Sequence, residues 1–280
     1  MTSPTLAPGS LLLDTTPLYE VYALRYATVE RQAHENFIAS DVHEGPMPMD
    51  YFVWLIRGDR RTIVVDTGFN AAAATRRKRE FLRCPGTALG ALGVDTTAVT
   101  EVVITHLHYD HAGNLDLFPN ARFYLQDAEM AFSTGRCMCH PVLRHAYDVE
   151  DVVAMVRKVY ADQVRFVAGE HSLGPGLSLH RIGGHTDGLQ VVRVATRRGW
   201  LVLASDAMHF YENHTREQPF PIVYNVGDML EGFRSLRMLA DGVVENIVPG
   251  HDPAVLNRYP RIDENGVEIA RLDLPAGIGG

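Results

Sequence analysis

The sequence predicts an α/β (α+β) protein with two packed mixed sheets flanked by helices. Apolar runs of strand length recur between residues 18 and 248, and segments with helical periodicity separate them. Their order suggests two similar halves, each with strands and helices. No linker rich in proline, glycine or serine divides the chain. We therefore expect one domain over residues 1–280, with a leader at 1–17 and a C-terminal extension at 253–280.

The first half opens with runs of aromatic and β-branched residues, which favour strands. Arg57-Gly58-Asp59 between two of these runs is typical of a hairpin turn. Residues 30–50 lack periodicity, so we expect a long loop that forms one wall of a pocket. The elements predicted are strands at 18–29, 51–56, 62–65, 101–105 and 120–125, helices at 70–83, from Asp127 and at 148–160, and an irregular segment at 133–147.

The second half returns to β structure. Its apolar runs are short and lie between glycine-containing turns, as expected for buried strands. One segment with helical periodicity precedes the last apolar run. The elements predicted are strands at 164–167, 177–182, 190–195, 200–204 and 246–248, and a helix at 226–241.

The charge and cysteine content of the chain indicate which kinds of molecule it can bind. The formal net charge is -8, which disfavours nucleic acid and anionic membranes as partners. The one dense basic run, residues 76–79, is interpreted as a solvated helix face. There is no secretion signal and no apolar stretch of spanning length, and the three cysteines do not form a disulfide framework. We expect a soluble cytoplasmic protein that acts on a small molecule, and we leave open whether it forms a homodimer.

A dense group of metal-binding side chains follows the apolar run Val102-Val103-Ile104. His106 and His108 are two positions apart, so in an extended segment both point the same way and can hold one ion. Asp110 and His111, beyond the bend, can reach a second ion. Imidazole and carboxylate are the ligands of zinc and of similar metals.

Three further candidates follow strands. His185 comes after the 177–182 strand through two glycines, Asp206 after the 200–204 strand, and His251 after the last strand. Together the seven residues suffice for two metals, and Asp206 can bridge them. Two cations about 3.5–4 Å apart hold a shared hydroxide, while one of them polarises a carbonyl oxygen. The expected chemistry is hydrolysis.

This pattern, His106-x-His108-x-Asp110-His111 and then His185, Asp206 and His251, resembles the metallo-β-lactamase superfamily. The resemblance runs from about residue 51 to residue 252 and includes Asp66-Thr67-Gly68. It implies a four-layer αβ/βα sandwich with the metals at one edge. It also implies that His106, His108 and His185 hold one metal, that Asp110, His111 and His251 hold the other, and that Asp206 bridges them.

The flanks of these residues resemble the N-acyl homoserine lactonase branch, for example Gly184-His185-Thr186 and Ser205-Asp206-Ala207. The resemblance implies a quorum-quenching zinc enzyme with two Zn²⁺ per chain, or Mn, Fe or Co in their place. It would open an N-acyl homoserine lactone or a similar small lactone by attack of the bridging hydroxide. Asp110 would carry the proton to the leaving alkoxide.

The chain departs from this branch at one position. The lactonases usually have a tyrosine three residues after the bridging aspartate, and here that residue is His209. A histidine can donate a hydrogen bond to a substrate carbonyl in the same place. The full set of expected substrate contacts is Phe69, Tyr109, His209, Tyr211 and Tyr224.

Other functions remain open at this stage. The metal ligands alone do not choose between a lactone and another cyclic amide, ester or phosphoester. An iron-dependent oxidoreductase of the same fold is a further alternative, because iron accepts the same ligands. The last alternative is a protein that binds metal without catalysing a reaction.

Overall fold

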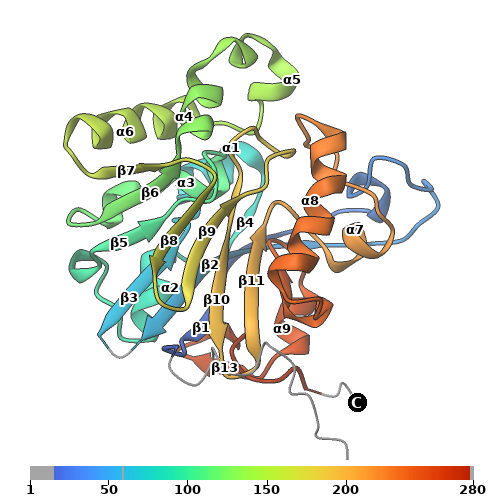
Figure 1. Cartoon of the computed structure of the whole chain (residues 1–280). Helices are drawn as coiled ribbons and strands as arrows, with labels where there is room; N and C mark the ends of the chain where they lie inside the picture. The colour runs from blue at the N-terminus through green and yellow to red at the C-terminus, as the bar shows by residue number, and fades with distance from the viewer. Residues whose placement is uncertain (1–15, 59, 278–280) are drawn as a thin grey trace, which may run out of the picture.

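The computed structural model describes residues 16–58 and 60–277, so most of the expected leader lies outside the described residues. Two mixed sheets face one another and helices cover their outer sides, as Figure 1 shows. The α/β prediction is confirmed. The four layers are helices, the first sheet, the second sheet and helices.

The first sheet has the strand order β13-β14-β1-β2-β3-β5-β6-β7, and β4 pairs with β1. Strands β3, β5, β6 and β7 run parallel to one another, and the hairpin β2–β3 is antiparallel, as expected. Its strands are β1 (Glu20–Val29), β2 (Met49–Gly58), β3 (Arg61–Val65), β4 (Glu80–Phe81), β5 (Glu101–Val103), β6 (Arg122–Gln126), β7 (Val164–Val167), β13 (Arg261–Glu264) and β14 (Val267–Arg271).

The second sheet has the order β12-β11-β10-β9-β8, and only β11 and β12 are parallel. Its strands are β8 (Glu170–Gly174), β9 (Leu177–Arg181), β10 (Gln190–Thr196), β11 (Gly199–Ser205) and β12 (Ile247–Pro249). The α-helices are α1 (Ala71–Arg77), α2 (Pro85–Ala91), α3 (Tyr109–Ala112), α4 (Asp127–Thr134), α5 (Pro141–Arg144), α6 (Val149–Tyr160), α7 (Tyr211–Thr215), α8 (Val226–Leu239) and α9 (Ala254–Arg258).

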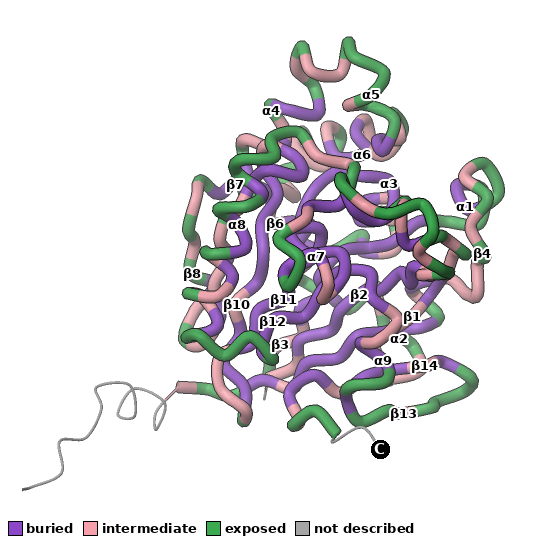
Figure 2. Tube along the Cα trace, turned by 90° about the vertical axis from the view of Figure 1, so that its right-hand side faces the viewer, coloured by how far each residue is buried: buried purple, intermediate pink, exposed green. Residues whose placement is uncertain are grey.

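The core has one apolar layer between the sheets and others beneath the outer helices. Strand β2 is buried on both faces, and its side chains alternate between two of these layers. Phe52 and Trp54 point into the layer between the sheets, whereas Val53 and Leu55 point toward the helices outside the first sheet. In Figure 2 the strands are largely buried, while the outer helices are partly exposed.

The structure differs from the predicted elements in several segments. The helix expected at 70–83 ends at Arg77, because Lys78 adopts a left-handed backbone (φ 55°) and the chain continues into β4. Residues 133–147, expected to be irregular, contain α5 and the 3-10 helix Arg136–Cys139. Residues 253–280 contain α9 and the hairpin β13–β14, which extends the first sheet beyond β1.

Among the described residues, no helix combines the length and the apolar character needed to cross a membrane.

Candidate metal centre

All seven predicted ligands are buried. They lie in turns that follow strands or in the short helix α3. His106 and His108 follow β5, Asp110 and His111 lie in α3, His185 follows β9, Asp206 follows β11, and His251 follows β12. Segments far apart in the chain therefore bring their polar side chains to one place.

The first group of ligand atoms comes from His106, His108, His185 and Asp206, which all lie within 4.8 Å of one another. His108 Nδ1 is 3.0 Å from His106 Nε2 and 3.0 Å from His185 Nε2. His185 Nε2 is 3.1 Å from Asp206 Oδ2. A tetrahedral shell with bonds of about 2.0–2.1 Å spaces its ligands about 3.3 Å apart. This group fits one divalent cation.

The second group consists of Asp110, His111 and His251. The other oxygen of Asp206, Oδ1, lies 3.2 Å from His111 Nε2 and 2.9 Å from His251 Nε2. His111 Nε2 is buried and makes no hydrogen bond with the described residues. A cation would satisfy this nitrogen, and the carboxylate of Asp206 would bridge the two groups.

In His111, His185 and His251, the ring nitrogen that faces away from the ligand groups, Nδ1, has a hydrogen-bond partner. His111 Nδ1 lies 2.7 Å from Asp66 Oδ2, His185 Nδ1 lies 2.6 Å from the Ile222 carbonyl, and His251 Nδ1 lies 2.9 Å from the Asp50 carbonyl. A partner on Nδ1 fixes the tautomer and leaves Nε2 free for a metal. The Asp66-Thr67-Gly68 motif thus contacts the second group through its carboxylate.

The protonation states agree with this arrangement. Burial and neighbouring imidazoles hold the pKa values of His106 and His108 well below the usual value, so both rings are neutral, as ligands must be. Burial raises the pKa of Asp206, but the surrounding histidines outweigh it and keep this carboxyl ionised. The pKa of His111 is raised despite burial, because Asp206 and other carboxylates attract a proton that a cation would replace.

Sequence reasoning missed Glu129, which connects two loops that bear ligands. Its Oε1 accepts hydrogen bonds from Leu107 N (2.9 Å) and Tyr147 Oη (2.9 Å). Its Oε2 accepts from Thr186 Oγ1 (2.6 Å) and Gly188 N (3.2 Å). An acidic residue in the first turn of a helix is ordinary, so the sequence offered no signal for this role.

From the sequence, the two glycines before His185 are expected to let the backbone come close to a metal, but the structure gives Gly184 a different role. Gly184 has φ +87°, and a Cβ there would lie 2.6 Å from the backbone nitrogen of Met229 in α8. This glycine permits close packing on α8 rather than a close approach to a metal.

The structure places His209 beside the ligands. Its Nε2 lies 3.0 Å from Asp206 Oδ2, and its ring stacks on Phe220 with centroids 3.9 Å apart. Burial lowers the pKa of His209 to about 3, so the ring is neutral. Its Nδ1 is buried without a hydrogen-bond partner among the described residues. The substrate contact expected of His209 stays a prediction.

The other expected contacts differ in position. Tyr109 lies in the wall of the centre, and its hydroxyl is 3.2 Å from that of Tyr51. Phe69 is fully buried behind these two tyrosines, so it supports the wall without lining the cavity. Tyr211 packs beneath Arg258 and does not line the cavity either. Tyr224 lines a neighbouring cavity.

A cavity of about 60 Å³ lies over the ligands. It is walled by metal-ligand candidates, aromatic side chains and arginines. The lining residues are Arg31, Met49, Tyr51, Arg77, Arg79, His108, Tyr109, Asp110, His145, Ala146, His185, Asp206, His209, Phe220 and Ile222.

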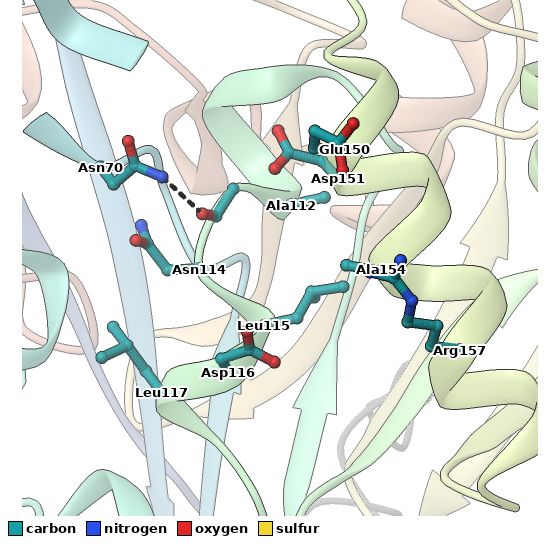
Figure 3. A pocket seen from close by; sticks show the side chains of 11 residues that line it. Asn70, Ala112, Asn114, Leu115, Asp116, Leu117, Glu150, Asp151, Ala154 and Arg157 are labelled. Carbon is teal, nitrogen blue, oxygen red and sulfur yellow. Dashed lines mark hydrogen bonds between the residues drawn. The ribbon is translucent and has the colours of Figure 1, made fainter. Parts of the chain in front are cut away.

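A larger hollow of about 440 Å³ lies between the segment that follows α3 and helix α6 (Figure 3). Asp116, Asp151 and Arg157 are among the side chains that line it, and none of the seven predicted ligands does. It is therefore separate from the ligand groups.

Comparison with known proteins supports the resemblance. The family model described as the metallo-beta-lactamase superfamily matches residues 47–251. An N-acyl homoserine lactonase AttM of Rhizobium johnstonii is 30% identical over 177 residues, which cover 62% of this chain and 66% of that protein. The AttM of Azorhizobium caulinodans is 31% identical over 58% of this chain and 62% of its own length. The chain thus spans just under two thirds of these relatives.

Solved structures share the fold at lower identity. A quorum-quenching N-acyl homoserine lactone lactonase has a TM-score of 0.70 and 21% identity, over 85% of this chain and 94% of that structure. AidC, described as a dizinc quorum-quenching lactonase, has a TM-score of 0.67 and 15% identity, over 95% and 97%. With the family model covering most of its length, the chain belongs to the metallo-beta-lactamase superfamily.

Proposed function

We propose that this chain is a metal-dependent hydrolase that opens the ring of a lactone, an N-acyl homoserine lactone or a similar small lactone, with two Zn²⁺ ions. The observation that carries the proposal is the position of Asp206. Its two oxygens face two separate groups of ligand atoms, one with His185 and one with His251. The relatives named as lactonases support the choice of a lactone.

The cations, when bound, supply a Lewis acid for the carbonyl and a water that ionises near neutral pH. The chain supplies the proton transfers. Asp110 lies in the second ligand group and also lines the cavity, so its carboxylate can accept the proton of the attacking water. It then gives this proton to the ring oxygen as the C–O bond breaks. The products are a hydroxyl and a carboxylate, with one water consumed and one proton released to the solvent.

His209 orients the substrate in this proposal. Its ring is neutral and is fixed by stacking on Phe220, and its Nδ1 has no partner among the described residues. The single ring proton faces the ionised Asp206 from Nε2, and it would be available to a substrate oxygen once cations engage that carboxylate. The lactonases that the sequence resembles usually have a tyrosine at this position.

A substrate panel tests the function. Protein loaded with zinc, manganese or cobalt is assayed by pH indicator on lactones, and in parallel on p-nitrophenyl esters and phosphodiesters. Oxygen uptake with a thiol tests the oxidoreductase alternative. We expect turnover of lactones above the other classes. A preference for phosphodiesters, or metal-dependent oxygen uptake, would contradict the proposal.

Asp110→Asn tests the mechanism. The amide cannot accept the proton, so we expect kcat to fall by about 10²–10⁴-fold. Most of the metal should remain, because His111, His251 and the bridging Asp206 are unchanged, and metal analysis measures this. Near-normal turnover by this variant would refute the role of Asp110.

A further inference from the structure

The basic run at residues 76–79 is not a uniform solvated face. Arg76 and Lys78 are exposed, but Arg77 and Arg79 are half-buried and line the cavity over the ligands. The left-handed backbone of Lys78 ends α1 and turns the chain toward β4. Arg31, from the segment after β1, lines the same cavity. Three guanidinium groups therefore line one cavity over the ligand groups.

None of these three arginines has an ion pair with a carboxylate within residues 16–58 and 60–277, whereas Arg76 pairs with Asp148. Arg79 donates through Nε to the hydroxyl of Tyr109 (3.1 Å), and its two Nη groups make no hydrogen bond to the described residues. A tyrosine hydroxyl is uncharged near neutral pH, so Tyr109 supplies no countercharge.

Two carboxylates line the cavity, but both are predicted metal ligands. Asp110 and Asp206 are its acidic lining residues, and both belong to the groups of ligand atoms. With cations bound at these groups, the negative charge of both is engaged. The guanidinium groups then face the cavity without an anionic partner.

The arginines are held in place by uncharged contacts. Arg77 lies over the ring of Tyr109, 3.8 Å from its centroid, and donates to the carbonyls of His145 and Tyr147. Arg31 donates through Nε to Asn36 Oδ1 (2.6 Å) and through Nη2 to the Glu35 carbonyl (2.6 Å), which leaves Nη1 for an anion, and it lies 5.2 Å from the centroid of Phe220. Half-buried cations that are fixed but unpaired are unfavourable until an anion arrives. This arrangement is preorganised for an anionic group, which guanidinium binds with paired hydrogen bonds.

We propose that the substrate is an anionic lactone, whose ring lies at the ligand groups while a carboxylate or phosphate elsewhere in the molecule binds Arg31, Arg77 and Arg79. This inference rests on the proposed function and specifies its substrate class. A plain N-acyl homoserine lactone has no charged group, so it would leave the three arginines unpaired. It is therefore expected to be a slower substrate.

Matched lactones test the inference. We compare three γ-lactones that differ in one substituent: a carboxylate, its carboxamide and a phosphate ester. For the better anion, we expect kcat/KM to exceed that of the carboxamide by about ten- to a hundred-fold, the usual effect of a charge-assisted hydrogen bond. Added salt should raise KM for the anions and leave KM for the carboxamide unchanged. Whichever anion is preferred identifies the group bound.

Variants assign the effect to the arginines. Arg79→Met should reduce the ratio of anion to carboxamide rates toward one, and Arg79→Lys should restore part of it. Arg31→Met gives an independent test if Arg79→Met fails to fold. Arg76→Met is the matched control, because Arg76 lies in the same run outside the cavity, and it should keep the wild-type ratio.

Equal rates with anion and carboxamide in the wild type, or a ratio unchanged in Arg79→Met and Arg31→Met, would overturn the inference and leave the proposed function intact. Failure to open any lactone with zinc, manganese or cobalt would overturn both.

Discussion

Replacing Glu129 with glutamine should weaken the fold and the first group of metal ligands together. The carboxylate accepts from Leu107 N and Tyr147 Oη on one oxygen, and from Thr186 Oγ1 and Gly188 N on the other. Leu107 lies between two ligands of the first group, and Thr186 follows the third. One buried side chain therefore fixes both loops.

The four hydrogen bonds of Glu129 determine how much stability the substitution should cost. In the amide, one oxygen is replaced by an NH₂ group that faces one backbone N–H and one hydroxyl. The hydroxyl can rotate and accept, but the N–H of Leu107 or of Gly188 is left buried without an acceptor, at a cost of about 1–3 kcal/mol. Burial raises the pKa of Glu129, so removal of its charge returns part of this cost. We expect a net loss of about 1–2 kcal/mol in the free energy of unfolding.

Two measurements check this. Urea unfolding of the metal-free protein gives the stability, and zinc titration against a competing chelator gives the two affinities. Loss of a residue that holds the metal ligands in place lowers metal affinity by about 10–100-fold. We expect this loss of zinc affinity at the first ligand group and little change at the second. Tyr147→Phe is the milder control, since it removes one donor of four. Unchanged stability with equal loss at both sites would refute the reasoning.

Three further predictions follow from other sites. Burial and Asp148 raise the pKa of Asp151 to about 7, so its contribution to stability is present below the unfolded value of 3.8 and is lost as pH rises through 7. Each pKa unit corresponds to about 1.4 kcal/mol, so Asp151→Asn should flatten this profile in urea melts by up to about 4 kcal/mol. A Cβ on Gly188 would lie 2.0 Å from a backbone nitrogen of α4, so Gly188→Ala should lower the free energy of unfolding by about 2–3 kcal/mol and lower Tm. The control Gly90→Ala, whose Cβ would have nothing within 4 Å, should change neither. Asp66→Asn removes the carboxylate on Nδ1 of His111 and should lower zinc affinity at the second site by about tenfold, with an unchanged affinity contradicting the role.

The sequence predicted the buried strands well because each is a short apolar run that ends at a polar residue. The ligand candidates were found for the same reason, since a histidine or an aspartate after such a run is visible without a structure. Strand β8 was missed because its segment, Glu170–Gly174, is largely exposed and polar. Strand β13 (Arg261–Glu264) carries no apolar pattern for the same reason.

Orientation was harder to predict than position. The run 76–79 reads as one charged block, and only the left-handed backbone at Lys78 decides that Arg77 and Arg79 face the cavity. A left-handed residue other than glycine is uncommon, so composition gave no warning of it. Glu129 was invisible for a related reason: its four donors come from three separate segments, which only the folded chain brings together.

The hairpin β13–β14 has a consequence for how the chain reaches its fold. The backbone nitrogen of Val21 bonds to the side chain of Asp273, 252 residues later, and Tyr22 pairs with Arg271. Until those late residues arrive, β1 has an open edge that can pair with another molecule. A chain stopped at residue 252 would contain all seven predicted ligands and yet be prone to associate through that edge. We therefore expect solubility during synthesis to depend on a segment that supplies none of the seven predicted ligands.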